Sequence, residues 1–411
     1  MVLTVGIIPF LGLIIPNIIS LFKGDNLAKT LPHTALLGMS FLLFCDILGR
    51  VLIFPYEIPI SMTVGVIGSA IFLFMLFRGG EHMRNRTKMF ILLGLAVIAV
   101  VLYLFWELNG NYHYAFPRRV IKVVAMALTG IAIAYSTVVF QTITHNRILT
   151  PSVMGLDALY MLIQTCIYFF FGSTSILVIN IYYNFTLAIG AMILFALIFY
   201  RVLFKEGKRP IYFLLLVGMI VGTFLGSITT FFQVLIDPNE FLGLQSKMFA
   251  SFNNVNSDLV WLAGVIILIT FVYGARHMNQ LDVMSLGRDT AINLGVPYDK
   301  LVQRMLILAS ILIAVSTALV GPITFFGLIV ANLSYQYFRT YKHSILITGS
   351  CVMSIVALVG GQWMVERLFS FTTTLSVIIN FVGGGVYFIY LLLREVGQQD
   401  DTSQRNYEVF W

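Results

Sequence analysis

The chain has six histidines and three cysteines, the side chains that most often bind metals or act as nucleophiles. The histidines lie far apart, at positions 33, 82, 113, 145, 277 and 343, and no two have the i,i+4 spacing of paired metal ligands on a helix. The cysteines at 45, 166 and 351 are equally scattered and form neither a disulfide framework nor a zinc-binding spacing. The sequence also lacks a phosphate-binding glycine loop and a serine–histidine–aspartate arrangement. We therefore expect no enzyme activity, metal, cofactor or nucleotide site on this chain.

Charged side chains within long apolar runs are the second place to look for chemistry. Each costs roughly 2.5–3.5 kcal/mol at the centre of a membrane helix. Asp46 is followed one helical turn later by Arg50, which suits an ion pair, and Glu366 and Arg367 come at the end of an apolar run. Asp157 lies near the start of another run. Because no file of acidic residues and histidines suggests a proton relay, an ion-coupled secondary transporter stays only an alternative.

The composition of the chain indicates what kind of secondary structure carries these residues. The chain is 59% hydrophobic, 14% aromatic and only 10% charged, whereas ordinary soluble domains carry roughly 25% charged residues. Residues 89–106 form an uncharged run of 18 residues, about the length that crosses a bilayer. The net charge of +7 comes from basic residues in short loops, which is the positive-inside pattern rather than a nucleic-acid surface. We predict an all-α, polytopic protein of the bacterial cytoplasmic membrane, without a cleaved signal peptide.

An internal repeat divides the chain. Residues 6–17 (GIIPFLGLIIPN) align with residues 321–332 (GPITFFGLIVAN) at an offset of 315 that continues without a gap, and Met1 then aligns with Ser316. We interpret residues 1–80 as the C-terminal part of a related unit that the chain start cuts through, and residues 81–411 as a complete unit. The first part has spans at 2–22, 32–54 and 59–77. The second has ten, at 89–107, 118–140, 152–171, 175–203, 210–235, 259–275, 302–320, 322–337, 344–362 and 373–393.

The basic loops predict that the N-terminus lies outside and the C-terminus inside. Arg118, Arg119 and Lys122 then fall outside, against the rule. They either dock an acidic partner or snorkel to lipid phosphates. A long inner loop, residues 276–304, has a sparse apolar pattern and glycine hinges, which suits docking of a soluble protein or a helix lying on the membrane.

Four stretches carry a resemblance to the FecCD-like family of iron–siderophore ABC transporter permeases. Residues 115–118 (AFPR) are similar to the family's R-L-P-R box, and residues 141–155 (QTITHNRILTPSVMG) to its Q-x-x-x-x-N-P-L-A-x-P-x-x-L-G motif. Residues 291–295 (AINLG) match A-x-x-L-G, and residues 321–332 match G-x-I-x-F-x-G-L-x-x-P-H. The order and spacing of these motifs cover residues 81 to the mid-390s.

The chain also departs from the family pattern. Arg147 and Ala331 stand where the family has prolines, and Ala115 replaces the first arginine of R-L-P-R. The first 80 residues resemble the last quarter of another such permease, since they keep Pro16 and the string at 57–60 (EIPI). These departures leave the expected fold unchanged, but they weaken the transfer of individual contacts.

The resemblance implies a ten-helix permease of the FecCD or vitamin-B12-importer type, preceded here by about three helices. It implies ATP-driven import of a ferric siderophore, with catecholate type as a guess and haem or cobalamin as alternative cargo. The second, fifth and tenth spans of the complete unit would line the path. A third hypothesis is that the fused residues 1–80 make the chain nonfunctional.

The implied partners are an ABC ATPase, an extracellular siderophore-binding (lipo)protein and a second permease, a paralogue that makes a heterodimer in the bilayer. The ATPase would bind the segment from about 286 to 298, at Leu286, Gly287, Arg288, Ala291, Leu294, Gly295 and Pro297. The binding protein would dock on arginines of the outer surface, Arg118, Arg119 and, more loosely, Arg367. Residues implied in helix packing or the path are Gln141, Asn146, Gly155, Gly321, Gly327 and Asn332.

Overall fold

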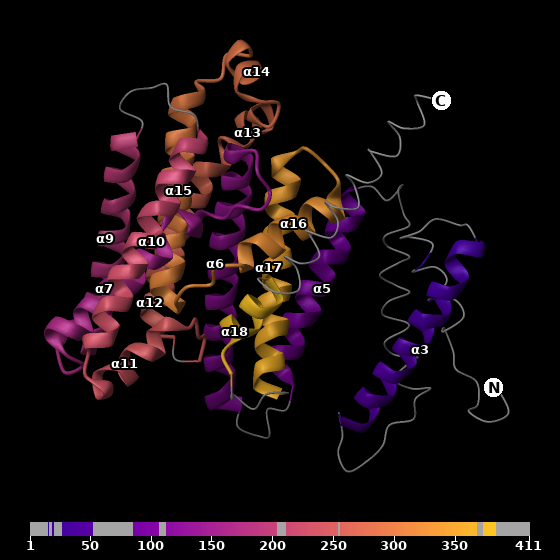
Figure 1. The fold of residues 1–411 in the computed structure, drawn as a ribbon, viewed down its shortest axis with the longest axis horizontal. Helices are drawn as coiled ribbons and strands as arrows, with labels where there is room; N and C mark the ends of the chain where they lie inside the picture. Colours follow the sequence, from indigo (N-terminus) through magenta and orange to yellow (C-terminus); the bar gives the residue numbers. More distant parts are fainter. Residues whose placement is uncertain are drawn as a thin grey trace. The chain divides into compact units, whose positions relative to one another are not determined.

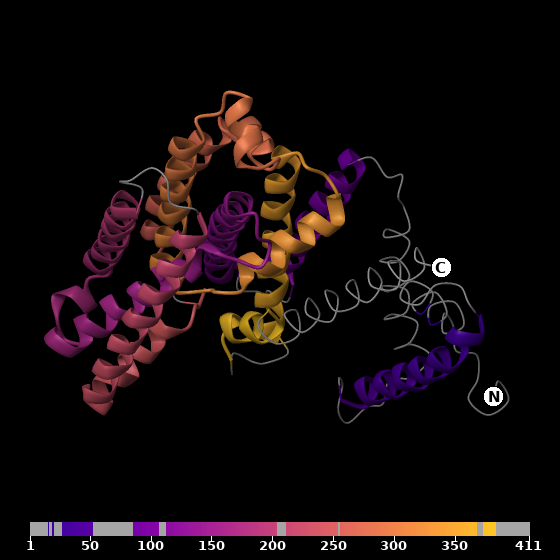
Figure 2. The same ribbon diagram turned by 45° about the horizontal axis from the view of Figure 1, so that its top comes forward.

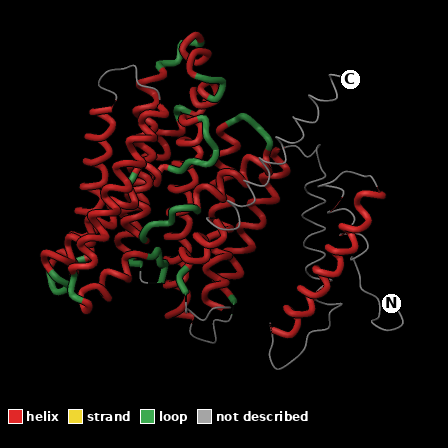
Figure 3. The backbone as a smooth tube through the Cα atoms, viewed as in Figure 1, coloured by secondary structure: helices red, strands yellow, loops and turns green. Residues whose placement is uncertain are grey.

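The computed structural model describes residues 15, 19, 27–51, 85–106, 112–203, 211–253, 255–367 and 373–383, and these contain helices and loops but no strand (Figure 3). The chain divides into two compact units, Met1–Arg84 and Asn85–Trp411. The first unit contains α3 (Leu27–Val51), which overlaps the span expected at 32–54. The other two spans expected there, 2–22 and 59–77, lie outside the described residues apart from 15 and 19.

The second unit is a bundle of helices that run between two opposite ends (Figure 1). Its elements in chain order are α5 (Asn85–Phe105), α6 (Tyr112–Thr144), the 3-10 helix η1 (Pro151–Met154), α7 (Leu156–Phe171), α8 (Ile176–Ile179), α9 (Ile181–Leu203), α10 (Ile211–Leu235), α11 (Pro238–Met248), α12 (Ser257–Ala275), α13 (Met278–Met284), α14 (Arg288–Asn293), α15 (Tyr298–Val320), α16 (Phe326–Phe338), α17 (His343–Arg367) and α18 (Leu375–Asn380).

Nine of the ten spans expected in this unit overlap helices over most of their length, with 175–203 divided between α8 and α9, and the tenth overlaps the short α18. Seven helices of the described chain are long and apolar enough to cross a membrane: α5, α6, α9, α10, α12, α15 and α17. The spans expected at 152–171 and 322–337 correspond to the shorter α7 and α16, and the last span is described only as far as residue 383. The protein is therefore an all-α, polytopic membrane protein, as its composition indicated.

Two helices form the centre of the bundle. In the apolar stretches of α6 and α15, 72% of the residues are buried, against 17% in α5 and 22% in α10. α17 packs along α6 and α5, and α15 packs against α6 and α9 (Figure 2). The outer helices turn large apolar side chains outward, among them Phe90 of α5 and Trp261 of α12. Such faces are stable against lipid or another membrane helix, where water does not penalise them.

The two ends of the bundle carry different short helices. α13 and α14 form one end, and α11 lies at the other (Figure 1). The basic loops assign the end with α13 and α14 to the cytoplasm; we call it the cytoplasmic end and the opposite one the outer end. The spans expected at 210–235 and 259–275 imply that residues 237–258 are a connecting loop, but α11 begins there because the Asp237 side chain accepts from the Asn239 backbone N–H and Pro238 takes the first helical position.

Candidate functional site

The segment proposed to receive an ATPase lies at the tip of the cytoplasmic end (Figures 1 and 2). Gly287 and Gly295, both with positive φ, form the turns before and after α14. The Ala291 side chain is fully buried beneath this helix, whereas Leu286 and Leu294 are each 62% exposed. The segment therefore presents two large apolar side chains to the surroundings, on either side of a short helix that is anchored by the buried Ala291.

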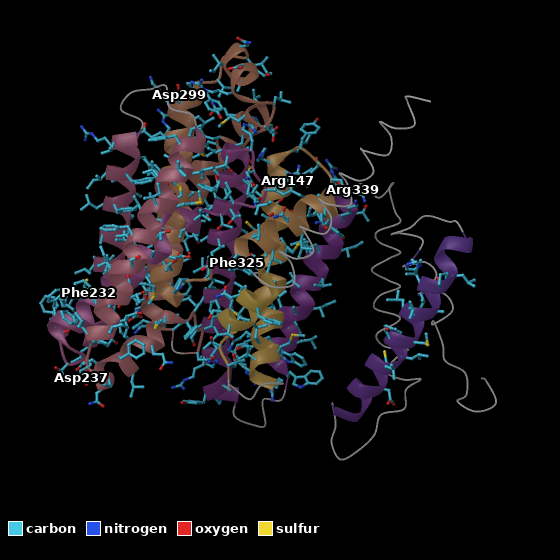
Figure 4. All side chains as sticks on the ribbon, in the orientation of Figure 1. Arg147, Phe232, Asp237, Asp299, Phe325 and Arg339 are labelled. Atoms are coloured by element: carbon cyan, nitrogen blue, oxygen red, sulfur yellow. The ribbon has the colours of Figure 1, made fainter. Side chains whose placement is uncertain are left out.

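The junction of this segment with α15 is held by Arg288. Its guanidinium lies 3.5 Å from the Asp299 carboxylate and 5.9 Å from the centre of the Tyr298 ring. Pro297 precedes the first turn of α15 as its N-cap residue. Figure 4 labels Asp299 at this end. α14 is therefore connected to α15, a central helix, by a short turn and an exposed ion pair.

A second connection joins α13, the helix directly before this segment, to α17, and it could not be predicted from the sequence. The Asp282 Oδ1 atom of α13 accepts the backbone N–H of His343, at 2.6 Å, and lies 2.6 Å from Nδ1 of the same residue. The His343 Nε2 atom lies 2.7 Å from the Thr142 hydroxyl of α6. The three residues are separated by 61 and 201 positions, so no local pattern in the sequence pairs them.

The arginines of the outer end have different surroundings. The Arg118 side chain is exposed and its guanidinium lies over the Tyr114 ring, 4.2 Å from the ring centre. Arg119 instead donates through Nη1 to the last carbonyls of α5, those of Tyr103 (3.1 Å), Leu104 (3.2 Å) and Trp106 (2.7 Å). It thereby caps the C-terminus of α5. Arg367 is exposed at the last position of α17.

A polar cluster lies next to these arginines. Glu366 Oε1 lies 3.0 Å from the Lys122 ammonium and accepts from the Tyr103 hydroxyl at 2.8 Å and from Gln362 at 3.0 Å. Lys122 and Gln362 both donate to Asn253 Oδ1, at 3.3 and 3.0 Å. The sequence grouped Lys122 with the two arginines as an anomalous outer cation. The structure pairs it with Glu366 from 244 positions away.

Lys247 of α11, which lies at the same end of the bundle (Figure 1), is a less suitable docking cation. Its side chain is half-buried, and burial lowers the pKa of the ammonium because the charged form is poorly solvated there.

Gln141 and Asn332, named from two separate motifs, meet at one backbone atom. Gln141 Nε2 and Asn332 Nδ2 each donate to the Arg147 carbonyl at 2.7 Å. The Asn146 side chain, which is exposed, accepts from the backbone N–H of Ile148 at 2.9 Å and shapes the same turn. Figure 4 labels Arg147 in this turn, toward the cytoplasmic end. These amides hold the turn after α6 against α16, which is a packing role.

Three glycines permit close approach of neighbouring elements. A Cβ on Gly321 would lie 3.0 Å from Ala250 Cα, and one on Gly327 would collide with the Thr137 side chain. Gly155 has φ of 87° and a Cβ there would lie 2.9 Å from Gly222 Cα. All three are therefore contact points of the bundle, in line with small residues at membrane-helix interfaces.

We expect Gly155→Ala to destabilise the protein strongly. The left-handed conformation alone costs an L-residue roughly 1–2 kcal/mol, and the Cβ would also force η1 away from the α10 backbone at Gly222. Thermal unfolding in detergent would measure the effect. Gly190→Ala on α9, where a Cβ meets nothing within 4 Å, is the matched control and should be neutral or stabilising. Equal midpoints for the two variants would contradict the packing role.

The sequence places Asp157 near the start of an apolar run but does not predict which side chains surround its carboxylate. The hydroxyls of Thr317 and Thr324 donate to its two oxygens at 3.5 and 3.4 Å. Thr317 belongs to α15 and Thr324 to the connection before α16. The carboxylate thus ties the start of α7 to both. In the described part of the chain no three His, Cys, Asp or Glu residues come together as a metal-ligand group.

Comparison with known sequences identifies relatives of both units. The model of the FecCD transport family matches residues 1–78 and 88–394. The petrobactin import system permease protein YclO of Bacillus subtilis (strain 168) is 58% identical over 313 residues, which are 76% of this chain and 99% of that protein. The petrobactin import system permease protein YclN of the same organism is 70% identical over 77 residues in the N-terminal region, which are 19% of this chain and 24% of that protein.

Comparison with solved structures supports the fold. An inward-facing ABC transporter assigned to the metal-chelate type superposes with a TM-score of 0.66 at 21% identity, covering 75% of this chain and 99% of that one.

Proposed function

The chain belongs to the FecCD transport family, and we propose that it is the membrane-spanning permease subunit of an ATP-driven importer of ferric siderophores. The observation that carries this proposal is the 58% identity to a permease of a petrobactin import system, over 99% of the length of that relative. Ferric petrobactin is accordingly the first candidate cargo. The catecholate type guessed from the sequence is not specified by the relatives, whose names refer to petrobactin and to hydroxamates.

The cytoplasmic segment supports a separate ATPase as the source of energy. Leu286, Ile292 and Leu294 are exposed apolar side chains at this tip, and an exposed apolar surface suits contact with another protein. ATP hydrolysis would then occur on the partner, and its closure would push through α14 into α15. This role also fits Gly287, Arg288, Ala291, Gly295 and Pro297, which shape or anchor the tip.

The outer end supports docking of a binding protein through Arg118. Its guanidinium is exposed and stacked on Tyr114, so it is oriented before a partner arrives. Arg119 contributes positive charge, but its donors are directed at α5. Arg367 adds charge at the end of α17. An acidic patch on the binding protein would complement this surface and would raise the association rate.

The path is proposed to run along α10, the fifth span of the unit. This helix exposes three hydroxyls at helical spacing among apolar side chains: Thr223, Ser227 and Thr230. Each donates to the carbonyl four residues earlier, at 2.9, 2.9 and 3.0 Å, so the oxygens keep acceptor capacity. A polar row suits a hydrated chelate better than lipid. α6, the second span, is mostly buried and can contribute little wall.

Residues 1–80 are proposed to be the C-terminal part of a second, paralogous permease, and residues 81–411 the complete transport unit. The support is the 70% identity of the front part to a different petrobactin permease from the one that matches the rest. Two distinct relatives also support a heterodimer as the transporting assembly.

Uptake of radiolabelled ferric petrobactin tests the proposal. A strain without its own petrobactin permeases would express this chain with a paralogous permease, the ATPase and the binding protein. We expect uptake that disappears when the ATPase carries a Walker-A lysine substitution and that survives a protonophore. Uptake that needs the proton gradient instead would favour an ion-coupled secondary transporter. Competition by unlabelled ferric hydroxamate, haem or cobalamin would define the cargo, and deletion of residues 1–80 would show whether the front part is needed.

A further inference from the structure

Helix α17 is held by side chains at its cytoplasmic end. The Asp282 carboxylate of α13 accepts the first backbone N–H of the helix and contacts the His343 ring. A carboxylate at this position is favoured by the positive N-terminal end of the helix dipole. The His343 side chain is only 3% exposed, and through Nε2 it reaches Thr142 at the end of α6. One buried ring therefore connects the cytoplasmic segment with two spanning helices.

The same helix is held again at its outer end. Glu366 and Gln362 lie on the last two turns of α17 and belong to the polar cluster with Lys122 of α6 and Tyr103 of α5. The Lys122 and Glu366 side chains are only 20% and 13% exposed, so the pair is shielded from water. Asn253, in the connection before α12, accepts from both Lys122 and Gln362.

α6 is the partner of α17 at both ends. It supplies Thr142 to the cytoplasmic cluster and Lys122 to the outer one. Between the clusters the two helices pack side by side: a Cβ on Gly130 would lie 2.6 Å from the Ser354 Oγ of α17. At 25 residues, α17 is roughly 37 Å long. Helices that are clamped at both ends and packed between them move together.

We propose that α6 and α17 form one transmission unit that connects the ATPase-binding segment with the outer docking surface, and that Asp282 is the positioning residue at its cytoplasmic joint. This inference rests on the proposed function. Arg118 and Arg119 lie in the first turns of α6, and Arg367 is the last residue of α17. A displacement of α13 is passed through the Asp282–His343 contact to both helices, and so to the outer surface. By linkage, binding at the outer surface biases the position of α13 in return.

The test uses the complete transporter in proteoliposomes, with the partner permease, the ATPase, the binding protein and ferric petrobactin. Asp282→Asn keeps the shape of the side chain and removes the charge; His343→Gln removes the ring; the double variant combines them. Asp258→Asn, an exposed carboxylate at the start of α12 and outside the ATPase-binding segment, is the matched control. ATP hydrolysis, uptake and the amount of assembled complex are measured together, with thermal stability in detergent as a check on folding.

We expect Asp282→Asn to lower uptake per ATP hydrolysed by about tenfold, the factor that corresponds to loss of one charge-assisted hydrogen bond. The binding protein should also stimulate ATP hydrolysis less. His343→Gln removes the ring contacts with both Asp282 and Thr142 and should lose at least as much, and the double variant should lose no more than His343→Gln because the ring contact is then already absent. Asp258→Asn should match the wild-type ratio.

A purely structural role of Asp282 would change the amount of complex and lower hydrolysis and uptake in proportion. An unchanged ratio of uptake to hydrolysis in Asp282→Asn, or losses that add in the double variant, would overturn the inference. The wild-type complex distinguishes failure of this inference from failure of the proposed function. If the wild-type complex shows no ATP-dependent uptake, the proposed function is wrong. If the wild type and the variants take up the same amount of substrate per ATP hydrolysed, only the transmission unit is refuted. At the outer end, Glu366→Gln should also reduce stimulation by the binding protein, and unchanged stimulation would contradict the model of one unit.

Discussion

Arg118→Glu should weaken binding of the siderophore-binding protein by at least about a hundredfold, since truncation at a close interfacial charge pair costs roughly 2–5 kcal/mol and reversal adds repulsion. The Arg118 side chain is exposed at the outer end and is oriented by the Tyr114 ring rather than by a carboxylate. It therefore has charge to offer to an acidic partner. Uptake at limiting binding protein should fall in parallel, while basal ATP hydrolysis should stay unchanged.

Surface-immobilised transporter titrated with the binding protein, with and without ferric petrobactin, would measure this affinity at two salt concentrations. The wild-type association rate should fall with salt because exposed charges are screened, and the Arg118→Glu variant should lose most of that dependence. Arg201→Glu, an exposed arginine of α9 toward the cytoplasmic end, makes the same change in net charge and should bind normally. An affinity in Arg118→Glu equal to that of Arg201→Glu would refute the docking assignment.

Much of the fold was accessible from the sequence, since it depends on the distribution of apolar residues. Uncharged runs long enough to cross a bilayer must form helices there, because the backbone can satisfy its hydrogen bonds in no other way within an open segment. The helices α5, α10 and α15 accordingly coincide with the predicted spans. α11 was missed although Asp237 and Pro238 carried a helix-start signal, because the polar composition of that stretch suggested a loop.

The contacts between distant residues could not be predicted. Asp282 with His343, and Lys122 with Glu366, join helices that the sequence places 61 and 244 positions apart. Periodicity states which face of a helix is apolar, but not which polar residue of another helix meets its ends. The common target of Gln141 and Asn332 is a backbone carbonyl, and a backbone atom leaves no trace in residue types.

The cytoplasmic tip is where a single substitution should have the largest effect on transport. Leu294 is 62% exposed at the C-terminal end of α14, a helix in which Ala291 is the buried residue, so Leu294→Asp leaves the fold of the permease intact while it places a carboxylate in the apolar contact with the ATPase. Burying an unpaired charge and losing an apolar anchor should cost at least about 2 kcal/mol of ATPase binding, the threshold of a hot spot. We therefore expect the ATPase to dissociate during purification and uptake to be abolished.

Co-purification of the ATPase with the detergent-solubilised permease would measure the loss, and Leu242→Asp supplies the control. Leu242 is 66% exposed on α11 at the outer end, so it makes the same chemical change far from the tip and should retain the ATPase. If Leu294→Asp retains both the ATPase and uptake, the ATPase must bind elsewhere on the cytoplasmic end. The exposed leucines would then face lipid, which is the alternative that the sparse apolar pattern of this segment left open. Retention of the ATPase with loss of uptake would instead place Leu294 in force transmission rather than in binding, because docking and coupling are separated only by this pair of measurements.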